Sequence, residues 1–291
     1  MLDFYHFVES SPTFRKFQID ELLFTAYDCP LEESPLDYWV GKNYFCYIVR
    51  GGARWKTPTE EFVFEVGDAA FLRKGAHRVF KLPDRDFCAL LIFIPDEFIA
   101  AELCHEPAVH SSKASYHLND TIFPLNLNQN LEDYFHTVLN YFSQSSPPAE
   151  SLLRIKFQEL IINLVTSDLN PTLRDYFREI CQKKKPALKP IMEEHFIFNL
   201  KMEDFARLSG RSLATFKRDF QQAFGCPPGK WLKNKRITYA KFLLETTDLN
   251  VNEIASESGF ENTSHFIKTF KENYGHPPLK FKKLRLIEQT A

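Results

Sequence analysis

The stretch SGRSLATFKRDFQQAFGCPP, residues 209–228, determines how the C-terminal part of this 291-residue chain folds. Phe216, Phe220 and Phe224 follow one another at four-residue steps, which places three aromatic rings on one face of a helix. A glycine and a proline pair then end that helix. The spacing predicts a helix whose aromatic face packs on a small core.

The same frame recurs in GFENTSHFIKTFKENYGHPP, residues 259–278, where Phe266, Phe270 and Tyr274 hold the same steps. In both copies an alanine stands four residues before the glycine that precedes the aromatic helix. A repeat of this length indicates a duplicated supersecondary unit. The C-terminal third of the chain therefore contains one helical motif twice.

Each copy has the sequence features of two helices that cross at a steep angle. We expect the first helices, 202–208 and 251–257, to end at Gly210 and Gly259, because glycine adopts the left-handed turn between them. Ser212 and Asn262 are natural N-caps for the second helices. The segment 229–246 is long enough to form a helix between the copies.

The outward face of each second helix carries small, polar and basic residues. A helix that enters the major groove of DNA needs this division, with aromatic residues inward and hydrogen-bonding side chains outward. The sequence therefore predicts two helix-turn-helix units that bind double-stranded DNA.

Composition and charge agree with a DNA-binding protein in the cytoplasm. Residues 186–291 carry 17 Lys and Arg against 12 Asp and Glu, a net of +5, whereas residues 1–185 carry a net of −7. A basic end on an acidic body suggests that the C-terminal part meets a polyanion. No apolar run is long enough to cross a membrane, and the six cysteines show no paired spacing, so we expect reduced thiols and no membrane.

The rest of the chain divides into strands followed by helices. Short β-branched and aromatic runs separated by turn residues predict strands at 44–50, 53–57, 61–66, 69–73, 77–82 and 87–94. Helical periodicity follows at 130–142 and 151–169, and the lysine- and proline-rich segment 183–190 is expected to be a linker. The predicted fold is α+β, with domains at 1–110, 111–185 and 186–291.

Residues about 195–285 resemble the C-terminal DNA-binding domain of AraC/XylS-type transcription regulators. The second copy, VNEIASESGFENTSHFIKTFKENYGHPPLKFKK, is close to the family signature. The strands resemble, more weakly, the cupin-like sensory domain of that family, through CYIVRGG (46–52) and VGDAAFLRKGAH (66–77). The resemblance implies a cupin-like β-barrel, a helical linker and dimerisation region, and a homodimer that binds DNA under the control of a small-molecule or protein effector. If the chain is an activator, RNA polymerase is a further partner.

The resemblance also implies which residues face DNA. The candidates for base contacts are Ala214, Lys217, Arg218, Thr263, Ser264, Ile267 and Lys268. The candidates for phosphate contacts are Lys230, Lys233, Lys235, Arg236 and Lys271. Because Ala214 offers only a methyl group and Ile267 cannot donate a hydrogen bond, Lys217 and Arg218 are expected to make most base contacts of the first unit.

The N-terminal strands contain aromatic residues that could line an effector pocket between them. The candidates are Trp39, Tyr47, Trp55, Phe64, His77, Arg78 and Phe80. No histidine lies between His6 and His77, so the H-x-H ligand run of metal-dependent cupins is missing, and we expect no metal, no cofactor and no enzyme activity. A cupin-type enzyme with a DNA-binding appendage is the alternative.

The helix predicted at 151–169 has a broader apolar arc than one packing partner requires. We expect this helix to form the homodimer, because pairing about a two-fold axis would hide the arc. The alternative is that the arc packs inside the domain, between the barrel and helix 130–142. The dimerisation candidates are Leu152, Leu153, Leu160, Ile161 and Leu164.

Overall fold

The computed structural model describes residues 1–29, 35–82, 86–111, 120–182 and 185–283. The chain forms two compact units, Met1–Lys184 (unit 1) and Lys185–Ala291 (unit 2). Unit 1 combines two β-sheets with helices, and the described secondary-structure elements of unit 2 are all helices.

Two β-sheets form the centre of unit 1. One has the strand order β1-β4-β9-β6-β7 and the other has the order β11-β8-β5-β10-β3-β2. The β1–β4 pair is parallel and the other described pairs are antiparallel. The strands are β1 (Leu2–Asp3), β2 (Arg15–Ile19), β3 (Leu22–Asp28), β4 (Leu36–Val40), β5 (Asn43–Arg50), β6 (Gly52–Lys56), β7 (Glu61–Glu65), β8 (Ala69–Leu72), β9 (Gly75–Lys81), β10 (Cys88–Ile94) and β11 (Ile122–Leu125).

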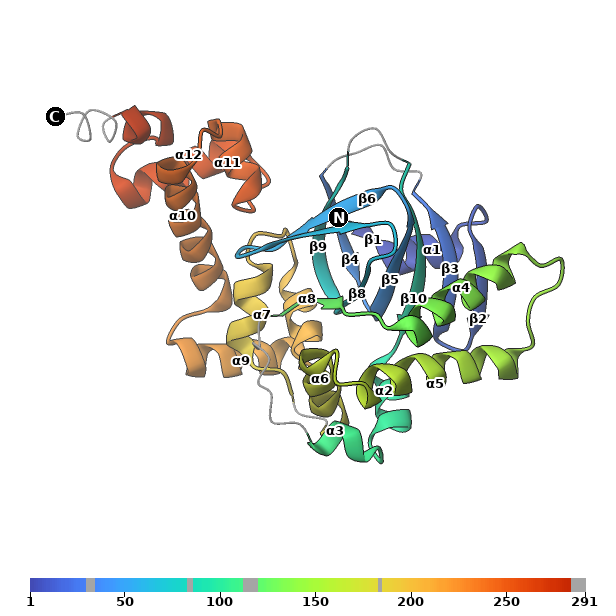
Figure 1. Ribbon diagram of the computed structural model, residues 1–291. Helices are drawn as coiled ribbons and strands as arrows, with labels where there is room; N and C mark the ends of the chain where they lie inside the picture. Colours follow the sequence, from blue (N-terminus) through green and yellow to red (C-terminus); the bar gives the residue numbers. More distant parts are fainter. Residues whose placement is uncertain (30–34, 83–85, 112–119, 183–184, 284–291) are drawn as a thin grey trace. The chain divides into compact units, whose positions relative to one another are not determined.

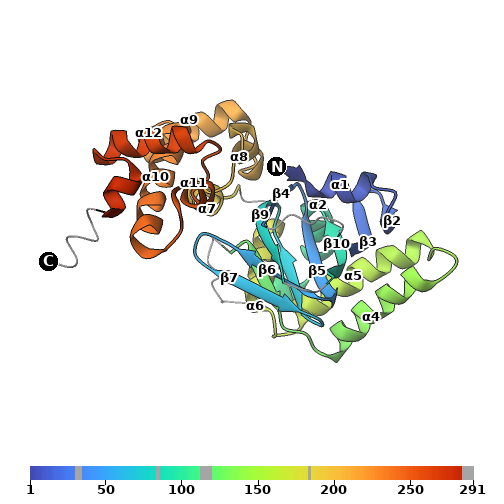
Figure 2. The ribbon, with the colours of Figure 1, turned by 90° about the horizontal axis from the view of Figure 1, so that it is seen from above.

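Helices cover the outer face of the six-stranded sheet (Figure 1, Figure 2). The helices of unit 1 are α1 (Phe4–Ser10), α2 (Asp96–Leu103), α3 (Pro107–Ser111), α4 (Gln129–Ser143), α5 (Glu150–Thr166) and α6 (Pro171–Cys181). Asn128 caps α4 by accepting a hydrogen bond from the backbone N–H of Leu131 at 3.0 Å.

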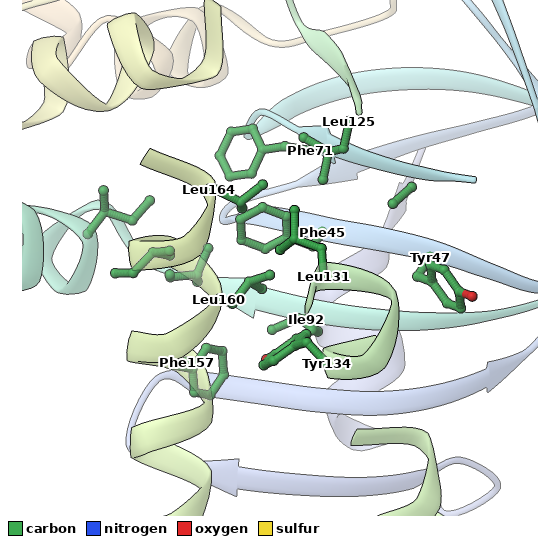
Figure 3. Packing of buried hydrophobic residues seen from close by; sticks show 14 of the residues in the cluster. Phe45, Tyr47, Phe71, Ile92, Leu125, Leu131, Tyr134, Phe157, Leu160 and Leu164 are labelled. Atoms are coloured by element: carbon green, nitrogen blue, oxygen red, sulfur yellow. The ribbon is translucent and has the colours of Figure 1, made fainter. Parts of the chain in front are cut away.

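Strand β5 shows how one sheet serves two cores. Tyr44 and Cys46 point into the core between the two sheets, whereas Phe45 and Tyr47 point into the core between the six-stranded sheet and the helices. Side chains alternate across a strand, so a continuous apolar run can fill both layers. Figure 3 shows the second core, in which side chains of α4 and α5 meet those of the sheet.

The packing of α5 corrects the predicted dimer interface. Leu153, Leu160, Ile161 and Leu164 are 3%, 0%, 0% and 1% exposed, and they lie in the core between the helices and the sheet. Figure 3 shows Leu160 and Leu164 there. The broad apolar arc exists because α5 packs on strand β2 and on α2, α3, α4 and α6 at once. Of the predicted residues, Leu152 alone is exposed, at 37%.

The structure does not separate the predicted segments 1–110 and 111–185. Helices α4, α5 and α6 share a core with the strands of the six-stranded sheet, so they belong to the same compact unit. In unit 1, strands β1, β2, β3, β4 and β11 and helices α1, α2, α3 and α6 are additions to the elements that the sequence predicts by range.

Unit 2 contains α7 (Leu188–His195), α8 (Met202–Leu208), α9 (Leu213–Phe224), α10 (Pro228–Thr246), α11 (Val251–Glu257) and α12 (Thr263–Tyr274). Helix α7 begins inside the segment 183–190 that was predicted as a linker, of which residues 183–184 lie outside the described part. Pro190 lies in the first turn of this helix, where the missing N–H costs no hydrogen bond. Leu188 is buried, so the helix starts where the chain gains a core contact.

Candidate nucleic-acid interface

Helices α8 and α9 form the first helix-turn-helix unit. Gly210, with φ +62°, makes the turn between them. The Ser212 hydroxyl accepts a hydrogen bond from the N–H of Thr215 at 3.3 Å and caps α9, and Gly225 ends that helix with φ +67°.

Helices α11 and α12 repeat this construction. Asn250 and Glu253 form a capping box at the start of α11, and Gly259 turns the chain with φ +83°. The Asn262 side chain accepts hydrogen bonds from the N–H groups of Ser264 and His265 at 2.8 and 3.1 Å. The predicted caps and glycine turns of both units are confirmed.

Aromatic residues hold each second helix to its own core. Phe216 and Phe220 in α9, like Phe266 and Phe270 in α12, are fully buried. The next aromatic residue of each series is half-buried: the ring of Phe224 stacks on Phe220 with 4.2 Å between centroids. These rings account for the aromatic ridge entirely as packing.

Two buried serines support the turns, and the sequence analysis missed them. Ser209 donates from its hydroxyl to the carbonyl of Ala206 at 2.8 Å, and Ser258 donates to the carbonyl of Ile254 at 2.5 Å. Both are 0% exposed. The signal was present in the sequence, because each serine directly precedes the turn glycine in the repeat.

The outward faces of α9 and α12 are exposed where base contacts are predicted. Ala214, Lys217 and Arg218 are exposed on α9. On α12, Ser264, Ile267 and Lys268 are exposed and Thr263 is half-buried. One further exposed residue on this face of α9 is Gln221, four residues after Lys217, which the helical spacing alone could have indicated.

Arg218 is held in place by an acidic neighbour. Its Nε and Nη2 donate to Asp219 Oδ1 at 3.3 and 3.2 Å, and Arg211 Nε donates to Oδ2 of the same carboxylate at 3.2 Å. Burial alone would raise the pKa of Asp219, but the hydrogen bonds from the two arginines outweigh it and lower the pKa. The carboxylate therefore stays ionised and orients the exposed guanidinium.

The predicted phosphate contacts differ in how available their charges are. Lys230 and Lys271 are exposed, and Lys233 is exposed with its Nζ 3.7 Å from a Glu272 carboxylate oxygen. Lys235 is half-buried and pairs with Glu193 at 3.3 Å. All four amines remain accessible at the surface of unit 2.

Arg236 differs from its prediction. Its Nε and Nη2 donate to the carbonyl oxygens of Phe196 and Phe198, both at 2.6 Å. Burial lowers the pKa of its guanidinium to about 10, and the nearby Glu261 opposes this shift. Because Nε and Nη2 donate to the protein backbone, the structure does not support Arg236 as a phosphate contact.

The structure does not gather the predicted effector residues into one pocket. Tyr47 stacks on Phe135 of α4 with 4.6 Å between ring centroids, on the helix side of the sheet. Trp55 lies between the sheets, and Phe64 packs edge-on against it at 5.6 Å. Trp39 is buried, and the half-exposed Phe80 lies under the guanidinium of Arg54 at 4.7 Å.

The two polar candidates in unit 1 make internal contacts. Arg78 donates from Nε and Nη2 to both carboxylate oxygens of Asp37, at 2.7 and 2.8 Å. His77 donates from Nε2 to the carbonyl of Arg73 at 2.7 Å and stacks on Tyr38. Burial lowers the pKa of His77 to about 4, so the ring is neutral near pH 7.

A small apolar cavity of about 40 Å³ does lie between the sheets, and Trp55 is the one predicted residue that lines it. Tyr38 and Tyr44 share a short hydrogen bond at its wall, and the indole N–H of Trp55 donates to the Tyr38 hydroxyl at 2.9 Å. The cavity is lined by Phe4, Tyr27, Cys29, Leu36, Tyr38, Tyr44, Cys46, Ala53, Trp55, Val79, Lys81, Phe87 and Leu91.

No group of three His, Cys, Asp or Glu side chains among the described residues could hold a metal ion. Over the same parts of the chain, no helix has the length and apolar character required to cross a membrane.

A β-sheet unit joined to a duplicated helix-turn-helix unit defines a class of DNA-binding transcription regulator. The family model described as "ExsA N-terminal regulatory domain" matches residues 43–176, and the model "Helix-turn-helix domain" matches residues 205–284. The chain belongs to the AraC family of transcription regulators. It is a DNA-binding regulator whose N-terminal part matches a regulatory domain, so the alternative of a cupin-type enzyme with a DNA-binding appendage is wrong.

One relative matches most of the chain, and another matches less than half of it. The chain is 26% identical to the virulence regulon transcriptional activator VirF of Yersinia enterocolitica over 79% of this chain and 85% of that one. It is 33% identical to the transcriptional regulator ExsA of Pseudomonas aeruginosa over 45% of this chain and 47% of that one. Among solved structures, ToxT of Vibrio cholerae covers 90% of this chain and 98% of its own, at 15% identity and a TM-score of 0.42.

Proposed function

We propose that this chain is a cytoplasmic activator of transcription that contacts RNA polymerase. It places α9 and α12 in successive major grooves of one DNA duplex. The observation that carries the proposal is the exposure of polar and basic side chains on the outward face of both second helices, opposite the buried aromatic face. Two copies of one helix-turn-helix frame in a single helical unit suit two grooves on one face of DNA, roughly 34 Å apart. The name of the VirF relative, a transcriptional activator, supports activation.

Within this proposal, Lys217 and Arg218 of α9 and Ser264 and Lys268 of α12 read bases. Arginine can donate two hydrogen bonds to one guanine, and Asp219 already aligns the Arg218 fork. Thr263, Ala214 and Ile267 contribute methyl or van der Waals contacts, while Lys230, Lys233, Lys235 and Lys271 contact phosphates.

The test is binding of the full chain to duplex DNA selected from a random pool. Affinity should fall steeply between about 50 and 200 mM salt, because neutralised phosphates release counterions. Transcription from a template that carries the selected site should rise with added protein. Affinity that ignores salt would contradict the DNA-binding mode, and unchanged transcription would contradict activation alone.

We further propose that two copies pair through the exposed side of α5. Leu152, Ile155 and Ile162 are 37%, 55% and 36% exposed, and their spacing places them along one stripe of the helix. A second copy would cover this stripe, and pairing would link two DNA-binding units at high effective concentration.

Replacing both Ile155 and Ile162 by Glu should leave a folded monomer with weaker binding to two-site DNA. Because the replaced side chains are exposed, the free energy of unfolding should change little. A wild-type chain that is monomeric at tens of micromolar would contradict this interface.

We also propose that a partner bound at the surface of unit 1 controls the protein. The cavity between the sheets, about 40 Å³, is much smaller than the roughly 150 Å³ that accommodates benzene. Ala53 lines this cavity and is 0% exposed. An Ala53→Val variant that fills the cavity should therefore keep its regulation in a reporter assay, and loss of regulation with retained folding would indicate a small-molecule effector instead.

A further inference from the structure

We propose that Arg236 is a positioning residue that fixes the second helix-turn-helix unit relative to the first, so that the protein selects the spacing between its two DNA contacts. This inference rests on the proposed function, in which α9 and α12 contact the same duplex. Arg236 itself touches no DNA in this arrangement.

The turn 196–199 links α7 to α8 and therefore belongs to the first half of unit 2. Arg236, in the middle of α10, donates to two carbonyl oxygens of this turn, those of Phe196 and Phe198, at 2.6 Å each. Both bonds are charge-assisted, and a planar guanidinium can make them together only in one orientation. The bonds therefore fix α10 against the end of α7.

The second helix-turn-helix unit also contacts this turn, next to Arg236. A Cβ atom at Gly259 would lie 2.6 Å from the carbonyl oxygen of Ile197 and 2.9 Å from Arg236 Nε. The Asn199 side-chain amide also donates to the Glu261 carboxylate, two residues beyond that glycine. We call Arg236, the turn 196–199 and Gly259 the Arg236 junction.

At the turn of the first helix-turn-helix unit, the glycine itself makes no such approach to another described segment. Gly210 occupies the equivalent position with φ +62°, yet a Cβ atom there would meet nothing within 4 Å. The two halves of the repeat thus differ in this respect: backbone packing at the turn occurs in the second copy. This difference indicates that the close approach at Gly259 serves the joint between the halves rather than the turn itself.

A rigid joint has a consequence for binding. We call the stretch of base pairs that each helix-turn-helix unit contacts a box. When the two units are held at a fixed distance, the second contact forms at a high effective concentration only if the DNA presents both boxes at that distance. A loosened joint would tolerate other spacings and lose affinity for the preferred one. The ratio between the affinities for two spacings therefore reports on the Arg236 junction. Removing one positive charge elsewhere on the helix weakens binding at both spacings alike and leaves this ratio unchanged.

The experiment compares full-length wild type, Arg236→Leu, Arg236→Lys and Lys233→Ala on duplexes selected by the wild type. Each duplex is also prepared with one or two base pairs inserted between the boxes. For the wild type, one inserted pair should weaken binding on the order of tenfold. Arg236→Leu should bind the preferred duplex several-fold more weakly than the wild type does. One inserted base pair should lower the affinity of this variant only about threefold or less.

The control, Lys233→Ala, removes a positive charge from the same helix without touching the junction. It should weaken all duplexes by the same factor and keep the wild-type ratio. Arg236→Lys keeps the charge without the fork and should give a ratio between wild type and Arg236→Leu. It decides the question if Arg236→Leu fails to fold by circular dichroism.

An unchanged ratio in the folded Arg236→Leu or Arg236→Lys variant would overturn the role of Arg236. A wild type that shows one box and no spacing preference would instead overturn the proposed two-groove function, so the two failures are distinguishable.

Discussion

Replacing Gly259 by alanine should destabilise unit 2 far more than the same replacement at Gly210. Both glycines adopt left-handed backbone angles, φ +83° and +62°. A residue with a Cβ atom loses about 1–2 kcal/mol in that conformation. At Gly210 this strain is the whole expected cost, because the new methyl group would meet nothing within 4 Å.

At Gly259 the methyl group would also lie 2.6 Å from the carbonyl oxygen of Ile197, which is backbone and has no flexible side chain to swing away. Moving that carbonyl displaces the turn whose flanking carbonyls accept hydrogen bonds from Arg236. Loss of one hydrogen bond to a charged group costs about 1.5–3 kcal/mol. The total for Gly259→Ala is therefore about 3–5 kcal/mol, a large part of the roughly 5–15 kcal/mol that stabilises a typical domain.

The assay is urea unfolding of residues 185–291, followed by circular dichroism and by the fluorescence of Trp231, the single tryptophan of that unit. The free energy of unfolding should fall about two- to threefold more for Gly259→Ala than for Gly210→Ala. Equal losses at the two positions would refute the reasoning, because they would show that the turn 196–199 yields without cost.

Three further outcomes follow from contacts in both units. Arg218→Ala should lose about 1–3 kcal/mol of binding free energy on the preferred DNA and relax selection at one or two base pairs, while Lys233→Ala should weaken binding to all sequences alike. If Arg218→Ala also weakened binding to every sequence equally, base reading by Arg218 would be contradicted. Burial lowers the pKa of His77 to about 4, so as the pH falls the unfolded chain binds the extra proton before the folded chain does. The free energy of unfolding should therefore fall by up to roughly 3 kcal/mol as the pH drops from about 6.5 to 4. In urea titrations, His77→Gln should lose this pH dependence. Leu160→Ala should cost about 2–5 kcal/mol in thermal or urea unfolding and leave the oligomeric state unchanged in light scattering, and a change of oligomeric state without loss of stability would return this leucine to an interface.

The sequence predicts unit 2 well because its signals are local. Aromatic steps, caps and turn glycines each act within a few residues, and the repeat states them twice, so that Ser212, Asn262, Gly210 and Gly259 all take their expected roles. Exposure of the outward faces of α9 and α12 follows directly from the same periodicity.

The errors arise where long-range packing decides. Leu160 and Leu164 show a periodicity that fits a dimer seam and a domain core equally well, and only the position of the six-stranded sheet settles the matter. Arg236 lies in a basic segment, but its donors meet carbonyls 38 and 40 residues away in sequence. Tyr47 and Trp55 are both inward-facing in a strand pattern, yet alternation across a two-layer structure sends them into different cores.

The most direct test of the account is a chemical footprint of the full chain on its selected duplex, combined with two variants. Wild type should protect two boxes in successive major grooves on one face of the DNA, about one helical turn apart. Arg218→Ala should lose protection or sequence preference in one box, and Lys268→Ala should lose it in the other. A single protected box, or two boxes that both respond to the same variant, would contradict the claim that each helix-turn-helix unit reads its own groove.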